Sequence, residues 1–353
     1  MELVLTRHLT DGDVLAKDAC NEYGRVLLKS GTKLNLQQIN LLKAAAVYFV
    51  TVVREDKNDI KTDSKLNLIK QTMVEVIPEL FRAIQNNDKE IIEKEFAVVD
   101  KMVDYIIDKK SINTTLFDVK EYDDYTYTHC VNTSIMATFL GLEMKLNEKE
   151  LKSLATGAIL HDIGKTKLPL ELLNKEGKLT SSEQNEIRKH PIYGYDILIK
   201  NGIKDPIILN GLLQHHERIN GNGYPLRLKG EQISKYSKII SVCDVFTALS
   251  ANRCYRKRFS PNDAYEYILS GTNEQFDSKV VDTFRKSFAI YPVGCGIRLS
   301  NGMEGIVRRQ NLGFPDRPVV RINYNSNSRT KISTYDIDLV KNTDIIIAEP
   351  IME

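Results

Sequence analysis

The sequence predicts a mainly α-helical protein with a small α+β unit at its N-terminus and a small β domain at its C-terminus. Apolar residues recur at helical spacing through most of residues 66–291. Short β-type runs lie before this region, and glycines interrupt β-rich runs after it. With 353 residues, the chain is long enough for two or three compact units.

Residues 1–55 are expected to form the N-terminal accessory unit. A segment with helical spacing, 34–45, lies between β-type runs. These runs are residues 2–5, 25–28 and 48–53. A small α+β unit accounts for this pattern, and the polar stretch 54–65 that follows offers little apolar surface to bury, so it is expected to be a linker.

Residues 56–120 are expected to contain this linker and a helical segment. From 66 to 109 the chain has no glycine and a single proline, Pro78. Its apolar residues recur at intervals close to the helical period. We therefore expect two helices that pack together.

Residues 121–291 are expected to form a larger helical domain. Thr180, followed three residues later by Glu183, is a capping-box pattern that marks a helix start. The predicted helix runs toward His190, which is expected near its end, and Pro191 interrupts it. This placement brings His190 to a helix terminus.

Residues 292–353 differ in character from the helical region. Five glycines, at 294, 296, 302, 305 and 313, separate runs rich in β-forming residues. A small β-barrel or β-sheet domain is the expected structure.

Composition excludes several classes of function. The 49 basic and 47 acidic residues leave a net charge of +2, so no overall field favours duplex DNA or RNA. The longest uncharged apolar run, 44–53, is half of the roughly 20 residues that a spanning helix needs, so we expect no membrane insertion. Arg7 and His8 stand where a secretory signal has its apolar stretch, which favours a cytoplasmic protein. Five single cysteines, without a C-x-x-C pair, argue against disulfides and thiolate zinc.

Five of the six histidines lie within one quarter of the chain: His129, His161, His190, His215 and His216. A single histidine is more often an ordinary core or surface residue, but a cluster favours a shared role. His161 and Asp162 follow one another at the predicted end of an amphipathic helix, so both can point to one place. Imidazole nitrogen with carboxylate oxygen suits zinc, iron or manganese, and a carboxylate can bridge two ions. Asp162 is the best candidate for such a bridge.

Asp244 lies inside the apolar run 239–249. A carboxylate among apolar neighbours is costly unless it is paired, protonated or bound to metal. We therefore expect Asp244 to lie beside a cation.

Taken in order, these residues resemble the HD-GYP subgroup of the HD-domain metal-dependent phosphohydrolases. The resemblance covers residues 125–284 and rests on many ordered matches. They are Tyr125, Thr126, His129, the run from His161 to Lys165, Leu179, Thr180, Glu183, His190, Pro191, His215, His216, Glu217, Gly221, Gly223, Tyr224, Pro225, Asp244, Arg253 and Tyr255.

The resemblance implies that the helical domain is an HD-type bundle whose metal centre hydrolyses cyclic dinucleotides, typically cyclic di-GMP, in bacterial second-messenger signalling. It implies metal ligands at His129, His161, Asp162, His190, His215, His216 and Asp244. Some members place a glutamate where this chain has Tyr125, and that glutamate helps to hold a third metal. We therefore expect two divalent transition metals, iron or manganese, which these ligand types do not separate.

Three further positions depart from the family pattern. Asn220 stands where the family usually has aspartate, Thr247 where aspartate is frequent, and Cys254 where proline is common. None of them is an expected ligand. The first two remove carboxylates near the site, so we expect a greater effect on turnover than on metal binding.

The expected reaction is in-line attack on phosphorus by a hydroxide held between two metals, with Asp162 as the central ligand. Lys165 lies one turn beyond Asp162 and is expected to neutralise charge that grows on phosphate oxygens. The alternative is an ordinary solvated lysine at a helix end. Arg253 and Arg256 follow Asp244 at a spacing that suits one side of a helix, and guanidinium groups suit phosphate. The resemblance assigns phosphate binding to the same positions.

Tyr224 lies in a loop, 221–225, in which glycines and a proline shape the backbone. Its ring can stack on a guanine or donate to a phosphate, or the loop can simply pack against the metal-binding helices. For Glu217, a structural role and a direct role are equally open.

The leading hypothesis is a phosphodiesterase that converts cyclic di-GMP to linear pGpG, with cleavage on to GMP left open. One alternative is a different cyclic dinucleotide, such as cyclic GMP-AMP, as substrate. Another is a signalling scaffold that binds a nucleotide or a protein without hydrolysis, which an intact ligand set argues against. The N-terminal segments either receive a signal, form a homodimer contact or serve as structural support.

Overall fold

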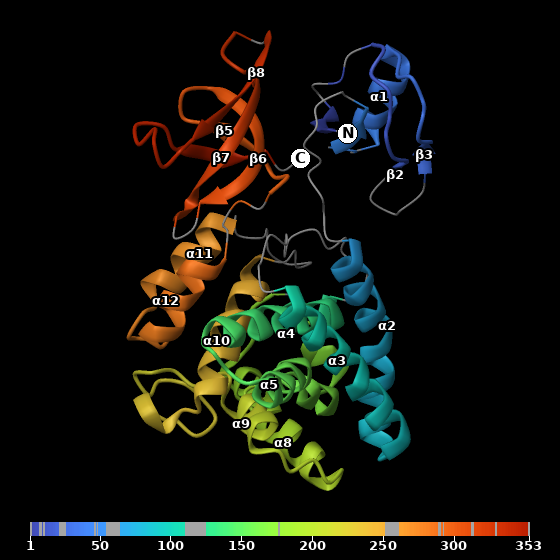
Figure 1. Cartoon of the computed structure of the whole chain (residues 1–353). Helices are drawn as coiled ribbons and strands as arrows, with labels where there is room; N and C mark the ends of the chain where they lie inside the picture. The colour runs from blue at the N-terminus through green and yellow to red at the C-terminus, as the bar shows by residue number, and fades with distance from the viewer. Residues whose placement is uncertain are drawn as a thin grey trace. The chain divides into compact units, whose positions relative to one another are not determined.

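The computed structural model describes residues 2–6, 9, 11–20, 26–45, 47, 49–53, 64–109, 125–175, 177–250, 261–288, 291, 293–311, 314–328 and 330–351. Contacts divide the chain into two compact units (Figure 1). The first holds the described residues of Met1–Asp63 and Ala289–Glu353, and the second holds those of Ser64–Ile112 and Glu121–Phe288. The metal-ligand candidates all belong to the second unit.

The N-terminal part of the first unit is a small α+β arrangement. Its elements are β1 (Glu2–Leu5), β2 (Ala19–Cys20), β3 (Val26–Leu28), α1 (Leu36–Ala44) and β4 (Phe49–Val52). β1 pairs antiparallel with β4, and β2 pairs antiparallel with β3. Leu15, Leu42 and Val52 are completely buried in its core, because the short strands and the helix share one apolar face.

The C-terminal part is a five-stranded antiparallel sheet in the order β8-β7-β6-β5-β9. Its strands are β5 (Gly296–Leu299), β6 (Met303–Asn311), β7 (Phe314–Asn325), β8 (Thr330–Asp338) and β9 (Ile347–Pro350). The β structure predicted for the C-terminal residues is therefore confirmed as a sheet. Ile297, Val307 and Val320 are completely buried in it, so apolar side chains of adjacent strands form its core.

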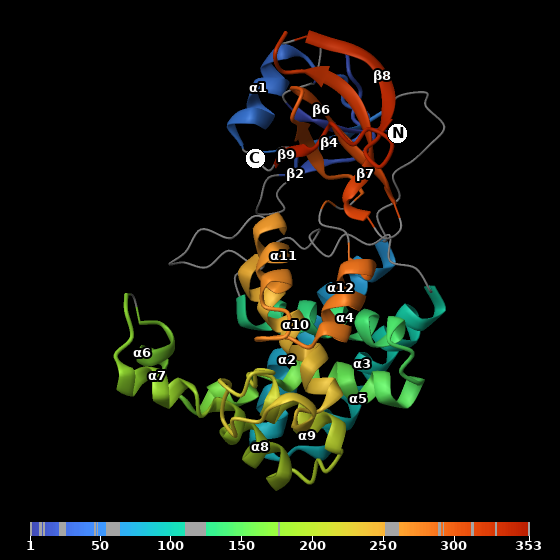
Figure 2. The same ribbon diagram turned by 90° about the vertical axis from the view of Figure 1, so that its left-hand side faces the viewer.

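The second unit is mainly helical in the residues described. Its elements are α2 (Ser64–Asn86), α3 (Lys89–Lys109), α4 (Tyr125–Glu143), α5 (Glu148–Leu160), η2 (Ile163–Lys167), α6 (Leu170–Leu173), α7 (Ser181–Ile187), α8 (His190–Lys200), α9 (Pro206–Gln214), η3 (Gly230–Gln232), α10 (Lys235–Ser250), α11 (Pro261–Ser270) and α12 (Ser278–Ser287). α4 and α5 pack against each other, and α9 and α10 pack against this pair. Figure 2 shows α6 and α7 projecting from the other helices of this unit.

The two helices predicted within residues 66–109 are confirmed as α2 and α3. Asn87, between them, has a positive φ of 56°, a conformation that asparagine tolerates better than most residues. α3 packs on α4 and α5, and α2 packs on α4. These helices therefore belong to the same compact unit as the metal-ligand candidates.

The predicted capping box at Thr180 and Glu183 is confirmed at the start of α7. The placement of His190 near the end of this helix was wrong, because α7 ends at Ile187 and His190 begins α8. Pro191 occupies the first turn of α8, where a missing backbone N–H costs nothing, so it helps to start a helix rather than to interrupt one. None of the described helices is long and apolar enough to span a bilayer.

The start of α5 is tied to the start of α10 through Glu150. Its carboxylate accepts hydrogen bonds from the Lys235 ammonium at 2.8 Å, the Tyr236 hydroxyl at 2.6 Å and the backbone N–H of Asn147 at 3.0 Å. The Lys235 ammonium, with Tyr236 and Asn147, lowers the pKa of Glu150 to about 2. The ionised carboxylate is therefore stabilised in the folded state.

We expect Glu150→Gln to lower the melting temperature at pH 7 by about 2–4 °C. Because the folded pKa lies below the unfolded value of about 4.3, the stabilisation is complete above that value and disappears as the pH falls toward 2. Thermal unfolding of both proteins at pH 7, 4.5 and 3 measures this difference. A difference in melting temperature that stays the same at all three pH values would contradict a stabilising role for the ionised Glu150 carboxylate.

Candidate metal centre

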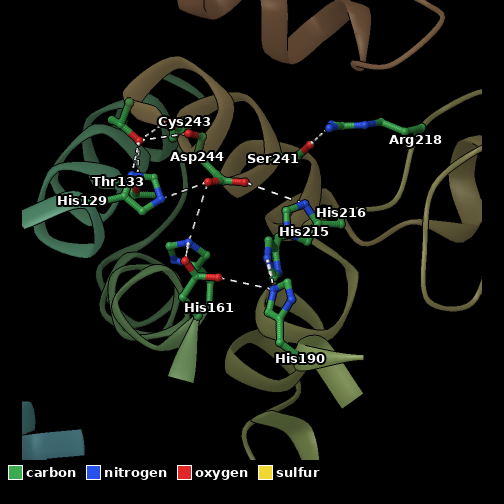
Figure 3. Close-up of polar contacts among 12 residues, drawn as sticks. His129, Thr133, His161, His190, His215, His216, Arg218, Ser241, Cys243 and Asp244 are labelled. Atoms are coloured by element: carbon green, nitrogen blue, oxygen red, sulfur yellow. Dashed lines mark hydrogen bonds and ion pairs between the residues drawn. The ribbon is translucent and has the colours of Figure 1, made fainter. Parts of the chain in front are cut away.

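The seven predicted ligand groups converge on one buried region, although they come from five helices or helix ends. His129 lies on α4, His161 caps the end of α5 and Asp162 follows it. The others are His190, the first residue of α8; His215, the cap of α9; His216, which follows; and Asp244 on α10. Figure 3 shows the five imidazoles and the Asp244 carboxylate around a common space. The structure therefore brings together the whole predicted set.

Three of these imidazoles are oriented by their own helix ends. The Nδ1 atoms of His161, His190 and His215 lie 2.7, 2.8 and 2.6 Å from the carbonyl oxygen of the residue three positions earlier. Because a carbonyl only accepts, each Nδ1 must carry the proton. In the neutral ring this leaves the lone pair on Nε2, which is the atom directed toward the common space. A backbone contact thus sets the tautomer that a metal ligand requires.

The atoms that face this space lack the partners that buried polar atoms need. His161 Nε2 and Asp162 Oδ1 are buried and have no hydrogen-bond partner in the described part of the chain. His190 Nε2 and His215 Nε2 are only 3.3 Å apart, with both Nδ1 atoms committed as donors elsewhere. Two neutral rings would therefore point lone pairs at each other. A cation between them removes this conflict, so the residues present fit a metal site.

Two groups of potential ligands share Asp162. One consists of His129, His161 and Asp162, and the other of Asp162, His190, His215 and His216. Within each group the ligand atoms all lie within 4.8 Å of one another. Asp162 Oδ2 is 3.4 Å from His161 Nε2, while its Oδ1 is 3.3 Å from His190 Nε2. The carboxylate therefore faces one group with each oxygen.

Asp244 occupies a second position between the histidines. Its Oδ1 lies 3.0 Å from His129 Nε2 and 3.8 Å from His161 Nε2, and its Oδ2 lies 3.9 Å from His216 Nδ1. These distances place imidazole nitrogens around the Asp244 carboxylate, and the cation expected beside it stays a prediction.

Burial keeps most of the imidazoles neutral. It lowers the pKa of His190 to about 4 and that of His215 to about 3. It also lowers the pKa of His129 and, together with the neighbouring His215, that of His216. At neutral pH these four rings are therefore uncharged, and each carries one N–H and one lone pair.

The two carboxylates remain ionised despite their burial. Burial alone would raise the pKa of Asp162, but the Lys165 ammonium and His161 hold it well below its usual range. His129 and His161 do the same for the pKa of Asp244 against the effect of burial. Burial acts to lower the pKa of His161, whereas Asp162 and then Asp244 raise it above the ordinary value. The site thus holds two buried, ionised carboxylates, and the Lys165 ammonium lies beside one of them.

Lys165, the predicted catalytic lysine, lies on η2 next to the shared carboxylate. Its Nζ is 2.6 Å from Asp162 Oδ2. Its side chain is only one-third exposed, so it is not simply a solvated lysine at a helix end.

Thr247, noted as a departure from the family pattern, contacts the first histidine directly. Its Oγ1 lies 3.1 Å from His129 Nδ1 and 2.9 Å from the Thr133 hydroxyl. Thr133 was missed from the sequence, although its position one helical turn after His129 on α4 was a usable signal. The two hydroxyls orient His129 in place of a carboxylate.

The structure decides the role of Glu217 in favour of a structural one. Its buried carboxylate accepts hydrogen bonds from the backbone N–H groups of Leu226 at 2.7 Å and Leu228 at 3.0 Å. Gly223 belongs to the same turn, where an added Cβ would lie 2.4 Å from the Glu217 Cα. Glu217 therefore shapes the loop that carries Tyr224.

The Tyr224 ring stacks on His216, with centroids 4.6 Å apart and an angle of 28° between the planes. Burial raises the pKa of its hydroxyl, which stays a neutral hydrogen-bond donor. The loop thus packs on the metal-ligand candidates. This contact is the second of the two alternatives given for Tyr224 in the sequence analysis. Arg253 and Arg256, the predicted phosphate-binding pair, and Cys254 lie outside the described residues.

Gly164 allows η2 and α8 to approach closely enough for Asp162 and His190 to meet. A Cβ added at this glycine would lie 1.9 Å from the His190 carbonyl oxygen and 2.6 Å from the Gly194 nitrogen. Since both contacts are with backbone, neither can be relieved by a side-chain rotation.

We expect Gly164→Ala to lower the free energy of unfolding by on the order of 3 kcal/mol and to reduce bound metal. The cause is displacement of the α8 backbone that carries His190. Urea unfolding and elemental analysis measure the two effects, and Lys167→Ala on the same short helix is the control. Wild-type stability and metal content in Gly164→Ala would show that this contact is not required.

Comparison with known families agrees with this geometry. Residues 113–280 match the sequence profile of the HD domain. This part of the chain is an HD domain. The HD domain holds every candidate ligand, and the resemblance to the HD-GYP subgroup is confirmed by the relatives that the chain matches.

One relative, from Pseudomonas aeruginosa, is named a cyclic di-GMP phosphodiesterase and is 33% identical over 242 residues, which are 69% of this chain and 58% of the relative. Another, from Vibrio cholerae, is named a 3'3'-cGAMP-specific phosphodiesterase and is 32% identical over 169 residues, 47% of this chain and 39% of the relative. The chain thus spans about half the length of these curated relatives. A solved structure from Bdellovibrio bacteriovorus, described as a HDG"Y"P protein, covers 80% of this chain and 97% of its own with a TM-score of 0.53. At 18% identity it supports the fold alone.

Proposed function

We propose that the HD domain of this chain is a metal-dependent phosphodiesterase that opens cyclic di-GMP to linear pGpG, with cleavage on to GMP left open. The observation that carries the proposal is the Asp162 carboxylate, which faces a histidine group with each of its oxygens. Such a carboxylate suits two metal ions, held at the roughly 3.5–4 Å separation used for phosphoryl chemistry. The curated relatives named as cyclic dinucleotide phosphodiesterases support the same class of reaction.

The chain's own residues prepare the site for this reaction. Bound metal ions supply an activated water molecule and positive charge at the reacting phosphate. Buried imidazoles with fixed tautomers hold the ligand geometry without reorganisation. The Lys165 ammonium, already next to Asp162, lies where it can neutralise charge that grows on a phosphate oxygen. Arg253 and Arg256 remain the proposed contacts for substrate phosphate.

Cyclic GMP-AMP is the second candidate substrate. The Vibrio relative named for it is 32% identical over 169 residues, and the Pseudomonas relative is 33% identical over 242 residues. Sequence identity alone therefore does not distinguish cyclic di-GMP from cyclic GMP-AMP as the substrate. A scaffold that does not hydrolyse its ligand is disfavoured, because every predicted ligand is present and converges on one space.

A substrate panel with defined metals tests the proposal. Protein purified without oxygen is stripped with a chelator, reloaded with Mn²⁺ or Fe²⁺, and incubated with cyclic di-GMP, cyclic GMP-AMP and cyclic di-AMP. Chromatography of the products and elemental analysis are the measurements. We expect close to two metals per chain and formation of pGpG before GMP. If the metal-loaded protein hydrolyses none of these rings, the proposed function is wrong.

A further inference from the structure

A pocket of about 490 Å³ adjoins the metal centre. Tyr224 forms part of its wall, and the same ring stacks on His216. Arg188 and Lys189, which immediately precede His190, form another part. The pocket therefore shares a wall with the ligand group that includes His190 and His216. Its volume lies within the range of small-molecule sites.

The charge of this pocket is positive. Its lining includes Arg188, Lys189 and Arg227 and contains no acidic residue. Lys189 is paired with Glu186 at 2.7 Å, but no ion pair joins Arg188 or Arg227 to any residue that the structure describes. The Arg188 guanidinium lies 5.5 Å from the centre of the Tyr224 ring, a distance that suits a cation–π contact. Two guanidinium groups are thus available to a ligand.

A second pocket and a nearby arginine differ from this arrangement. A second pocket of the same volume is lined by Glu171, Glu183 and Glu186 with only Lys175 to oppose them. Arg218, although close in sequence, donates to the Ser241 hydroxyl at 2.9 Å (Figure 3). It also lies over the Phe276 ring. Its guanidinium is therefore already engaged.

We propose that this pocket is a second phosphate subsite, in which Arg188 and Arg227 bind the phosphate of the dinucleotide that is not being cleaved. The proposal rests on the proposed function. A cyclic dinucleotide carries two phosphates in one ring, and only one can lie at the metal centre at a time. The other keeps its negative charge and needs donors nearby. Guanidinium groups bind phosphate through paired N–H donors, so they are suited to this role.

The linear product has the same requirement. When its terminal phosphate leaves the metal centre, this phosphate can occupy the subsite while the internal phosphate moves to the metal centre. The subsite thus favours two successive cuts without full release.

The test compares a substrate with two phosphates and one with a single phosphate. The variants are Arg188→Gln, Arg227→Gln and the double variant, with Lys200→Gln, an exposed lysine of α8 outside the pocket, as the matched control. Each is assayed with cyclic di-GMP and with bis(p-nitrophenyl) phosphate. We expect each arginine variant to raise KM for cyclic di-GMP on the order of tenfold, with kcat changed less than about twofold. Turnover of the single-phosphate ester should fall far less, and metal content should not change.

Calorimetry of pGpG binding to chelator-treated protein gives a readout that needs no catalysis. We expect the double variant to bind pGpG much more weakly than the wild type and Lys200→Gln to bind normally. The subsite would be overturned by calorimetry if the double variant bound pGpG with wild-type affinity or if the wild type did not bind pGpG. It would also be overturned if the arginine variants lost activity equally with both substrates. If the metal-loaded wild type cleaves the single-phosphate ester but no cyclic dinucleotide, the proposed function fails, and calorimetry alone then decides the subsite.

Discussion

Asp162→Asn is expected to remove most of the bound metal and to lower kcat for cyclic di-GMP by at least about 1000-fold. The carboxylate belongs to both groups of potential ligands, so one substitution weakens both. The amide keeps the shape of the side chain but has one neutral oxygen and an N–H₂ group that would face an imidazole. Elemental analysis and steady-state kinetics measure the two effects.

A matched control separates this effect from a loss of folding. Asp196→Asn, at an exposed position on α8, makes the same chemical change away from the site and should keep metal and activity. Circular dichroism of both variants checks that the helical unit remains intact. Two metals per chain in Asp162→Asn would exclude the carboxylate as the shared ligand.

Lys165→Met is expected to lower kcat by about 100-fold while metal content stays close to that of the wild type. Methionine has a similar volume and no charge, so the change removes the ammonium that lies 2.6 Å from Asp162. A group that acts on the transition state affects kcat, whereas a group that only balances the charge of Asp162 affects metal affinity. Lys167→Met, on the same short helix and exposed, is the control.

Metal titration and kinetics on the same samples distinguish these roles. Lost metal affinity with normal kcat at saturating metal would assign Lys165 to the carboxylate rather than to the substrate. The opposite pattern, a low kcat with full metal occupancy, supports its proposed contact with phosphate.

Part of the site could be predicted because its chemistry is local in the sequence. His161 and Asp162 are adjacent at a helix end, and a buried aspartate such as Asp244 needs a partner wherever it lies. The position of His190 was harder, because Pro191 is compatible both with ending one helix and with starting the next. In the structure, one helix ends at Ile187 and the next begins at His190, so Pro191 starts a helix.

Contacts between distant positions were not predictable in the same way. His129 and Asp244 lie 115 positions apart yet are joined at 3.0 Å. Thr247 reaches His129 only because α10 packs against α4. From the sequence, Glu217 could equally have faced the metal centre or its own loop. In the structure, two backbone N–H groups of the loop donate to its carboxylate and hold it there.

The amino-acid sequence alone determined the order of helices and strands, the kinds of ligand atoms and their adjacency within helix ends, because these follow from spacing along the chain. Tertiary structure alone decided that Asp162 is shared by two histidine groups and that Arg188 and Arg227 line one pocket beside them. Such relationships depend on the close backbone packing of separate helices, as at Gly164 and His190, and no local pattern encodes the distance between them.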